Sequence, residues 1–392
     1  MSDVGAPRKL RIAIASLGRF HVLDLARELS ALGHEVHFYS YVPKSRAVRF
    51  GLPARCHVSL LVLLWPWVAL SLLIRRGPFA TKIDKGLQWA ANVAVRLRLQ
   101  PCDVFIGMSG IYVEAAEYAK RRYGSSIVVE RGSMHIQAQR EILAEVRKLQ
   151  PEAGTVPDWA VERELRSYGL ADRVVVPSTH AEASFLARGF SESRLVKIPY
   201  GVELDVFSPD PVIVRDARLI IFVGAWSYQK GVDILTEAMQ VLSRQGMRLC
   251  HIGSPGDAKK PDAAWFSTVG HVDQLKLREW YCRAALLVLP SRQDGFGLVL
   301  TQALACGCPI VGSRVTGAVD LAAIERLAPM VSVVDCRAAA DLCDAIVQCM
   351  SQPAHHDMVA STRQLLSWTS YGRRYASMLA TMDQEARDSS VQ

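Results

Sequence analysis

The sequence lacks the short motifs of several common protein classes. Its nine cysteines are scattered and no two have the C-x-x-C spacing, while the ten histidines include no H-E-x-x-H pattern. These absences predict free thiols in a reducing compartment, with neither a disulfide framework nor a metal site. No secretory signal opens the chain, because residues 10–15 form only a short apolar run after two basic residues. A cytoplasmic protein is therefore expected.

Repeats and low-complexity tracts are also missing, so a globular chain is expected throughout. Its 392 residues exceed the usual size of one domain and suit two domains of about 190 residues each. Half of the residues are hydrophobic and 21% are charged. That composition provides ample core for both domains.

One segment has almost no acidic residues. Residues 41–100 contain ten Lys or Arg and a single acid, Asp84, for a net charge of +9, whereas the whole chain carries +8. A local positive field of this kind favours an anionic surface or ligand as the partner.

Within this segment, residues 58–74 are apolar except for two serines, with a Trp-Pro-Trp sequence near the middle. A helix that spans a bilayer needs about 20 residues and would split the first domain, which argues against a span. A buried core helix and an interfacial helix that docks on an anionic membrane both remain open. In the second case Trp65, Trp67, Arg75 and Arg76 are the candidate membrane or acceptor contacts.

Strands and helices alternate along both halves of the chain. Residues 10–15 and 35–39 predict two strands with a helix between them, but the first turn has one glycine and no G-x-G-x-x-G motif. The Gly-, Pro- and Asp-rich stretch at 200–211 predicts an interdomain linker. We expect an α/β protein of two Rossmann-like, doubly wound domains that face each other across a cleft, at 1–208 and 209–364. A C-terminal helix near 365–382 is the candidate to pack back on the first domain.

The most informative stretch is PSRQDGFGLVLTQALACGCPIV at 290–311, in which a polar, glycine-containing loop leads into a helix and then a strand. The N-terminus of that helix, after Gly297, offers backbone N–H groups to an anion. Asp294 and Gln302 are eight residues apart. At about 100° per residue they lie within roughly 80° of each other, so both side chains can border one ligand.

The second half contains, in order, VGAWSYQKGVDILTEAM, HIGSPGD, GHVD, LPSRQDGFGLVLTQALACGCPIVGS and TGAVD. This series resembles the nucleotide-sugar-binding domain of GT-B glycosyltransferases, in particular the retaining glycosyltransferase family 4. The linker IPYGVELDVFSP is similar to the interdomain segment of that family, and FHVLDLARELSALGHEV to its first helix and second strand. The resemblance covers nearly the whole chain, with 41–100 the least typical part.

The resemblance implies a site for a nucleotide-diphosphate sugar on the second domain. The donor-binding positions that it implies are Gly18, Arg19, Gly224, Lys230, Gly253, Val272, Asp294, Phe296, Gly297, Leu298 and Gln302. The family has two glutamates where this chain has Asp294 and Gln302. Asp294 keeps the charge that grips sugar hydroxyls, on a shorter stem, while Gln302 keeps one acceptor oxygen for the ribose and loses the charge.

The catalytic positions that the resemblance implies are His135, Lys230 and Asp294. His135 matches a family histidine that faces the donor sugar across the cleft; the alternative for it is a structural hydrogen bond. Lys230 matches a lysine beside the donor pyrophosphate, but Ala225 stands where the family has an arginine. Arg19 and Arg292 are candidate replacements for the missing cation.

No D-x-D occurs, so the metal-diphosphate clamp of the other main glycosyltransferase fold has no ligands here. We expect a metal-independent reaction without a cofactor, in which Lys230 and helix-end amides stabilise the leaving diphosphate. The resemblance implies that the anomeric configuration is retained.

The expected activity is transfer of a hexose from a UDP- or GDP-sugar to a lipid-linked glycan or glycolipid, in bacterial surface polysaccharide synthesis. The protein would then be peripheral on the inner face of the plasma membrane, with no nucleic acid among its partners. Two alternatives stay open: a soluble glycosyltransferase with a small-molecule acceptor, and a non-catalytic protein that binds a nucleotide sugar.

Overall fold

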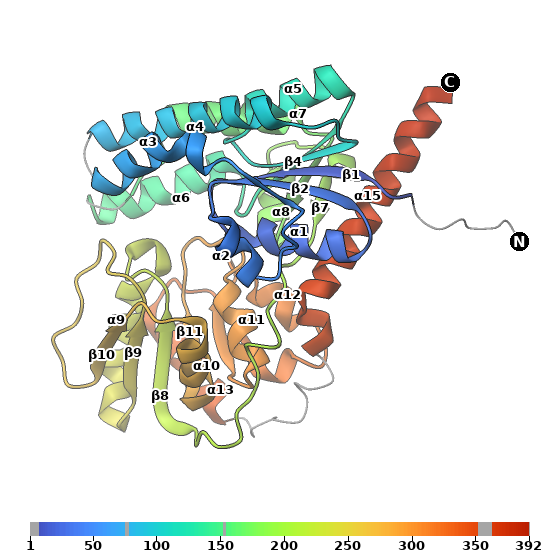
Figure 1. Cartoon of the computed structure of the whole chain (residues 1–392). Helices are drawn as coiled ribbons and strands as arrows, with labels where there is room; N and C mark the ends of the chain where they lie inside the picture. Colours follow the sequence, from blue (N-terminus) through green and yellow to red (C-terminus); the bar gives the residue numbers. More distant parts are fainter. Residues whose placement is uncertain (1–7, 75–77, 152–153, 352–362, 392) are drawn as a thin grey trace, which may run out of the picture.

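A computed structural model describes residues 8–74, 78–151, 154–351 and 363–391 of the chain. It shows two α/β domains, one above the other in Figure 1. Over the described residues, the first sheet has the strand order β3-β2-β1-β4-β5-β6-β7 and the second has β10-β9-β8-β11-β12-β13, with every pairing parallel. The predicted fold class is therefore confirmed.

The first domain alternates strands and helices up to residue 197. Its strands are β1 (Arg11–Ala15), β2 (Glu35–Ser40), β3 (His57–Ser59), β4 (Val104–Met108), β5 (Ser126–Glu130), β6 (Arg173–Val176) and β7 (Leu195–Lys197). Its helices are α1 (Phe20–Ala31), α2 (Lys44–Arg49), α3 (Leu61–Leu73), α4 (Pro78–Arg98), α5 (Val113–Tyr123), α6 (Ile136–Leu149), α7 (Asp158–Leu170), α8 (Thr179–Leu186) and the short 3-10 turn η1 (Glu192–Arg194).

The second domain repeats the pattern from residue 216. Its strands are β8 (Asp216–Val223), β9 (Arg248–Ile252), β10 (Phe266–Gly270), β11 (Ala284–Leu289), β12 (Ile310–Ser313) and β13 (Val331–Val334). Its α-helices are α9 (Val232–Leu242), α10 (Gln274–Arg283), α11 (Leu298–Ala305), α12 (Ala318–Ala322) and α13 (Ala339–Ser351). Four 3-10 turns follow the same order: η2 (Tyr228–Lys230), η3 (Ser243–Gln245), η4 (Ala328–Met330) and η5 (Arg363–Leu366).

The last helix, α15 (Trp368–Val391), returns from the second domain to the first and packs on α1 (Figure 1). Tyr371, Tyr375 and Leu379 are buried in one apolar cluster with Leu25 of α1. The two helices approach so closely that a Cβ on Gly372 would lie 2.4 Å from the Cβ of Glu28. Glycine is required at that crossing.

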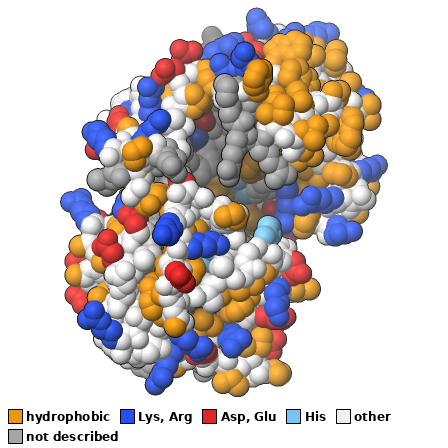
Figure 2. All heavy atoms as spheres, turned by 90° about the vertical axis from the view of Figure 1, so that its left-hand side faces the viewer, with side chains coloured by type: hydrophobic (Ala, Val, Ile, Leu, Met, Phe, Trp, Pro, Cys, Tyr) orange, Lys and Arg blue, Asp and Glu red, His pale blue; other side chains and the backbone are white. Residues whose placement is uncertain are grey.

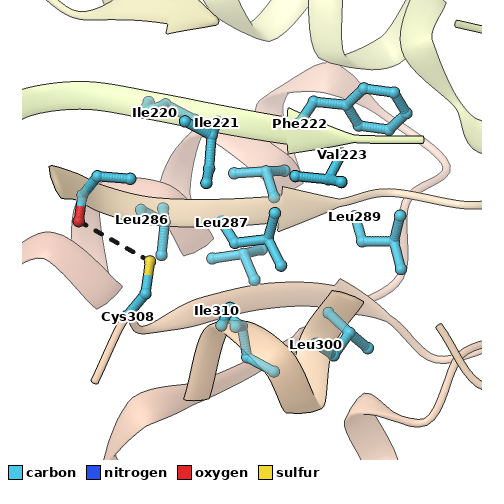
Figure 3. Close-up of a cluster of buried hydrophobic side chains, with 14 of the residues drawn as sticks. Ile220, Ile221, Phe222, Val223, Leu286, Leu287, Leu289, Leu300, Cys308 and Ile310 are labelled. Carbon is cyan, nitrogen blue, oxygen red and sulfur yellow. Dashed lines mark hydrogen bonds between the residues drawn. The ribbon is translucent and has the colours of Figure 1, made fainter. Parts of the chain in front are cut away.

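The second domain is organised around β11, the strand that carries the 290–297 loop. Leu286 and Leu287 are fully buried between β8 and β12, and Leu300 of α11 covers them (Figure 3). The continuous apolar run of β11 follows from this position, because a parallel strand is buried on both faces. The loop therefore starts from a rigid strand end.

Three elements differ from the sequence-based expectation. Helix α4 begins at Pro78, whereas the apolar periodicity of the sequence predicts a helix only over 87–99. Strand β10 was not predicted, since it is an edge strand whose residues are mostly exposed and which lacks an apolar run. The apolar run 58–74 divides into the end of β3 and helix α3, because Tyr39 and Ser40 pair with residues 58 and 59.

Candidate functional site

Two loops at the carboxyl edge of the second sheet form the site, as is usual for open α/β sheets. Residues 224–231 follow β8 and residues 290–297 follow β11. The Gln229 carbonyl accepts a hydrogen bond from the Arg292 amide at 2.9 Å, and the Gln229 side chain bonds the Gln293 amide oxygen at 2.5 Å. Gly231 has φ +70°, and a Cβ there would lie 2.0 Å from the Pro290 carbonyl oxygen. The two loops therefore form one tightly packed unit.

Lys230 and Asp294, predicted from sequence alone, meet at the junction of these loops. The Lys230 ammonium lies 2.5 Å from the Asp294 carboxylate, and both side chains are partly accessible. The second carboxylate oxygen of Asp294 accepts from the Gly295 amide at 2.8 Å. A cation that binds phosphate and a carboxylate that accepts hydroxyl hydrogen bonds thus stand side by side.

The two candidates for the missing cation, Arg292 and Arg19, form their contacts away from the Lys230–Asp294 pair. Arg292 forms two 2.6 Å hydrogen bonds with the Asp233 carboxylate and donates to the Tyr228 carbonyl. The Arg19 guanidinium stacks 3.5 Å from the centre of the Phe50 ring, beside a cavity of about 740 Å³ at the hinge between the domains. Trp226, next to Ala225, is fully buried. Lys230 is therefore the cation that these loops bring to Asp294.

A loop of the first domain closes on Asp294 from the opposite side. The Gln293 side chain donates to the Ser133 hydroxyl at 2.5 Å, and a Cβ on Gly295 would lie 1.8 Å from the Gly132 carbonyl oxygen. The Ser178 hydroxyl donates to the Gly295 carbonyl at 2.6 Å, and His180 Nε2 lies 2.6 Å from the Asp294 carbonyl. Residues 131–134 and 178–180 therefore contact the 293–295 backbone directly.

His135 directly follows the 131–134 loop, at the N-cap of α6. Its Nδ1 accepts from the Gln137 amide at 3.3 Å, and its ring packs against Phe185 and Tyr168 at centroid distances of 4.9 and 5.2 Å. The side chain is buried, and burial together with the charges of Arg188 and Arg131 lowers the pKa of His135 to about 4. These contacts identify His135 as a neutral histidine that caps α6. None of them connects it to Lys230 or Asp294.

Gln302 faces another residue that the sequence did not single out. Its amide oxygen accepts from the Tyr281 hydroxyl of α10 at 3.0 Å. The hydrogen bond fixes the amide so that its NH₂ group points away from the tyrosine, since the oxygen is held by a donor. Tyr281 is fully buried, and burial raises its pKa well above the ordinary value, so the hydroxyl stays a donor.

Five other predicted donor positions lie in the loops that follow strands β1, β8, β9, β10 and β11. Gly224 and Gly253 pack against each other, because a Cβ on Gly253 would lie 2.1 Å from the Gly224 carbonyl oxygen. Gly297 has φ +79° and is the N-cap of α11. Gly18 accepts a hydrogen bond from the Ser16 hydroxyl in the first domain, and Val272 is half-buried before α10.

Two predicted donor positions belong to the core between the domains. The Phe296 ring is buried against Tyr200 at a centroid distance of 5.7 Å, and Leu298 packs against the same cluster. A Cβ on Gly317 would lie 2.4 Å from the Phe296 ring. The Phe296 side chain therefore anchors the loop, together with the Phe296 carbonyl, which accepts from the Gly317 amide at 2.7 Å.

The predicted membrane residues divide into two groups. Trp65 is 58% exposed on α3, whereas Trp67 is half-buried and faces α4 so closely that a Cβ on Gly86 would lie 2.0 Å from its ring. Only Leu64 and Val68 of α3 are buried, so the alternative of a buried core helix is wrong. Arg75 and Arg76 lie outside the described residues.

A buried pair that sequence reasoning missed lies beneath the 131–134 loop. His21 Nε2 is 2.8 Å from the Glu130 carboxylate, and the His21 ring packs on Tyr200 at 4.2 Å. A Cβ on Gly132 would lie 3.1 Å from the Tyr200 hydroxyl. No spacing in the sequence marks these residues, because they come from three distant segments.

The described part of the chain contains no group of three or more His, Cys, Asp or Glu side chains that could hold a metal ion. Within the same ranges, no helix is both long and apolar enough to cross a membrane.

Comparison with known families gives a match in each domain. The model described as Glycosyltransferase Family 4 matches residues 19–206, and the model described as Glycosyl transferases group 1 matches residues 217–352. The chain is 28% identical to a D-inositol 3-phosphate glycosyltransferase of Xylanimonas cellulosilytica over 76% of this chain and 75% of that one. It is 27% identical to the D-inositol 3-phosphate glycosyltransferase 2 of Catenulispora acidiphila, over 80% and 77% of the two chains.

Solved structures show the same fold. The sucrose-phosphate synthase of Thermosynechococcus elongatus matches 96% of this chain and 100% of its own with a TM-score of 0.68 and 18% identity. Anabaena HepE, solved in complex with UDP-glucose, matches 95% of this chain and 100% of its own with a TM-score of 0.65 and 13% identity. The two family matches and the shared fold agree with each other. The chain is a glycosyltransferase of the GT-B fold, composed of a Glycosyltransferase Family 4 domain and a Glycosyl transferases group 1 domain.

Proposed function

We propose that this glycosyltransferase moves a hexose from a UDP- or GDP-sugar to an acceptor presented at an anionic membrane surface, with retention of anomeric configuration and without a metal ion. The observation that carries the proposal is the apolar, basic-flanked hairpin of α3 and α4 on the first domain. The donor assignment is supported by the Lys230–Asp294 pair and by relatives whose structures contain UDP-glucose.

At the donor site, each residue has a separate task. Lys230 neutralises charge that grows on the departing diphosphate, and the amides at the start of α11 add donors for the same phosphate. Asp294 accepts hydrogen bonds from the sugar hydroxyls once the donor phosphate replaces it as the partner of Lys230. Gln302 presents its amide to the ribose, oriented by Tyr281. Attack and departure then occur on the same face of the sugar.

Contact between the 131–134 loop and the 293–295 backbone supports a closed arrangement for the reaction. Closure excludes water, which strengthens the interaction of Lys230 with phosphate and protects the donor from hydrolysis. The buried His21–Glu130 pair holds the base of that loop, and His135 caps the helix that follows it. Both act by positioning the loop.

The membrane assignment rests first on exposure. Val62, Trp65 and Leu73 of α3 are 84%, 58% and 81% exposed, and Phe79 and Trp89 of α4 are exposed as well. Figure 2 shows hydrophobic side chains gathered on the first domain, with Lys and Arg side chains at the edges of this patch. A continuous apolar surface of this kind marks an interaction site.

Charge and length then favour a bilayer over a protein as the occupant. The segment 41–100 carries a net charge of +9, and each Lys or Arg near an anionic surface contributes about 1 kcal/mol to binding. Helix α3 has 13 residues, so it is about 20 Å long and shorter than the roughly 30 Å hydrocarbon layer. It therefore lies in the interface, with Trp65 directed outward and Trp67 against α4.

Flotation with vesicles tests this part. We expect the protein to float with vesicles of mixed phosphatidylcholine and phosphatidylglycerol, and a smaller fraction to float with phosphatidylcholine alone. Trp65→Ser should lower the fraction that floats with the mixed vesicles. Val212→Ser is the matched control, since Val212 is an exposed apolar residue just after the linker. Flotation that depends neither on lipid charge nor on Trp65 refutes the membrane proposal, and the exposed face of α3 is then a protein-binding surface.

A small-molecule acceptor is the second candidate, because the curated relatives are named D-inositol 3-phosphate glycosyltransferases. Transfer to a water-soluble sugar phosphate at the same rate with and without vesicles favours it. The donor base is tested by a thermal-shift panel of UDP-, GDP- and ADP-sugars, in which a true donor stabilises the fold by about 2.7 kcal/mol at a hundredfold excess over its dissociation constant.

A further inference from the structure

Two cysteines meet behind the donor site, between α10 and α11. Cys282 lies near the end of α10 and Cys306 directly follows α11. Both side chains are buried, each thiol shifts the pKa of the other, and the Cys282 thiol donates to the Ser208 carbonyl at 3.5 Å. Both also line a cavity of about 330 Å³ whose other walls are Pro209, Asp210, Pro211, Ile213 and Arg215. The pair is thus shielded from bulk solvent but open to a small molecule in the cavity.

The surroundings of the pair assign different roles to the two sulfurs. Interaction with the Cys306 thiol and the charges of Arg278 and Arg215 lower the pKa of Cys282 against the effect of burial, whereas interaction with the Cys282 thiol and burial raise the pKa of Cys306. Arg278 is fixed by a 2.8 Å hydrogen bond to the Ser208 carbonyl. Thiolate character makes Cys282 the nucleophile, and Cys306 is the neighbour that keeps its proton.

The third nearby cysteine, Cys308, does not line this cavity. The Cys308 thiol donates to the Ala284 carbonyl at 3.8 Å, the contact drawn in Figure 3. Burial raises the pKa of Cys308 to about 11. The reactive unit is therefore a pair.

We propose that Cys282 and Cys306 are a redox-active dithiol, a modification site for peroxide that links α10 to α11 beneath Gln302. In the first step the Cys282 thiolate attacks one peroxide oxygen, the O–O bond breaks, and a sulfenic acid and hydroxide form. In the second step the Cys306 sulfur displaces the sulfenic oxygen as water, with loss of the Cys306 thiol proton, and the S–S bond forms. Two electrons pass from the thiols to the peroxide.

The disulfide matters for the donor because the same two helices hold Gln302. Tyr281 precedes Cys282 on α10, and Gln302 lies one helical turn before Cys306, which follows α11. The Tyr281–Gln302 hydrogen bond and the thiol pair are therefore neighbouring contacts between the same two helices. An S–S bond is about 2.05 Å long, shorter than any contact between two unbonded sulfur atoms, so oxidation draws the end of α11 toward α10. We expect Gln302 to shift with it. This consequence rests on the donor role proposed for Gln302.

Mild hydrogen peroxide treatment of the ligand-free full-length chain, followed by intact mass and peptide mapping, tests the site. We expect the loss of two hydrogens and a peptide pair joined through 282 and 306, abolished by Cys282→Ser and by Cys306→Ser but not by Cys343→Ser. Cys343 is the matched control because it is the more accessible thiol. Oxidation confined to Cys336 or Cys343, or a sulfinic acid without a disulfide, overturns the proposal.

Donor binding to the reduced and oxidised forms is the second measurement. We expect the dissociation constant of the donor to rise about three- to tenfold on oxidation, the equivalent of roughly one weakened hydrogen bond, and to stay unchanged in Cys306→Ser. Equal affinity of the two forms refutes the link to Gln302. Reduced protein that binds no nucleotide sugar refutes the proposed donor instead, and the mapping result still decides the thiol pair.

Discussion

Gly295→Ala is expected to separate the two domains at the donor loop. In the structure, a Cβ at this position would lie 1.8 Å from the Gly132 carbonyl oxygen, whereas Cβ contacts below 3.0 Å essentially never occur. The two backbones would have to move apart by the difference, about 1.2 Å. The obstacle is backbone on both sides, so no side-chain rotation relieves it.

The cost follows from the contacts that this movement breaks. Three interdomain hydrogen bonds meet at 293–295: from Gln293 to Ser133, from Ser178 to the Gly295 carbonyl, and between His180 and the Asp294 carbonyl. At about 0.5–1.5 kcal/mol each, their loss disfavours the closed state by roughly 2–4 kcal/mol. If the closed state is the reactive one, kcat falls by a factor of about 30–1,000.

The assay is transfer or donor hydrolysis by purified Gly295→Ala, with donor binding measured in parallel. We expect kcat to fall while the dissociation constant of the donor changes little, because the second domain keeps Lys230 and Asp294. Gly154→Ala is the control, since nothing lies within 4 Å of a Cβ there. A variant with wild-type kcat would show that the contact between the 131–134 and 293–295 segments plays no part in the reaction.

Three further outcomes are expected. Tyr281→Phe releases the Gln302 amide and should weaken donor binding about fivefold by calorimetry; unchanged affinity would separate Gln302 from the ribose. Trp67→Ala empties the space against Gly86 and should lower the free energy of unfolding by about 3 kcal/mol in urea titrations, whereas Trp65→Ser should leave it nearly unchanged. The pKa of His135 is lowered to about 4 in the folded state, so the unfolded state binds the extra proton below pH 6.5 and stability rises with pH between 4 and 6.5. His135→Asn keeps an N-cap and should reduce this pH dependence, which destabilises the wild-type protein by on the order of 1–2 kcal/mol at pH 5. Parallel curves of unfolding free energy against pH for the two proteins would contradict the assignment.

The fold and the centre of the site were predictable from the sequence because their signals are local. The apolar run 285–289, the glycines after it and the short helix that follows lie within one continuous stretch. They gave the strand, the turn and the place of Asp294. Lys230 was predicted from its motif, and the structure brings it within 2.5 Å of Asp294.

The remaining features depend on contacts between distant segments. Nothing near Gln302 in the sequence indicates Tyr281, which is 21 positions away on another helix, and His21 meets Glu130 across 109 positions. Trp65 and Trp67 are equivalent in composition, and only the packing of α3 on α4 separates the exposed ring from the half-buried one. His135 matched by position, yet its surroundings depend on Tyr168 and Phe185, which belong to later helices.

The most direct test of the central claim is the rate of nucleotide-diphosphate release from the donor found in the thermal-shift panel, with chelator present. We predict that wild-type protein stays active with chelator, that Lys230→Ala lowers kcat by about 10²–10³, and that Lys276→Ala, which removes an exposed lysine of α10, has no effect. Full activity of Lys230→Ala, or loss of wild-type activity on chelation, would contradict the account.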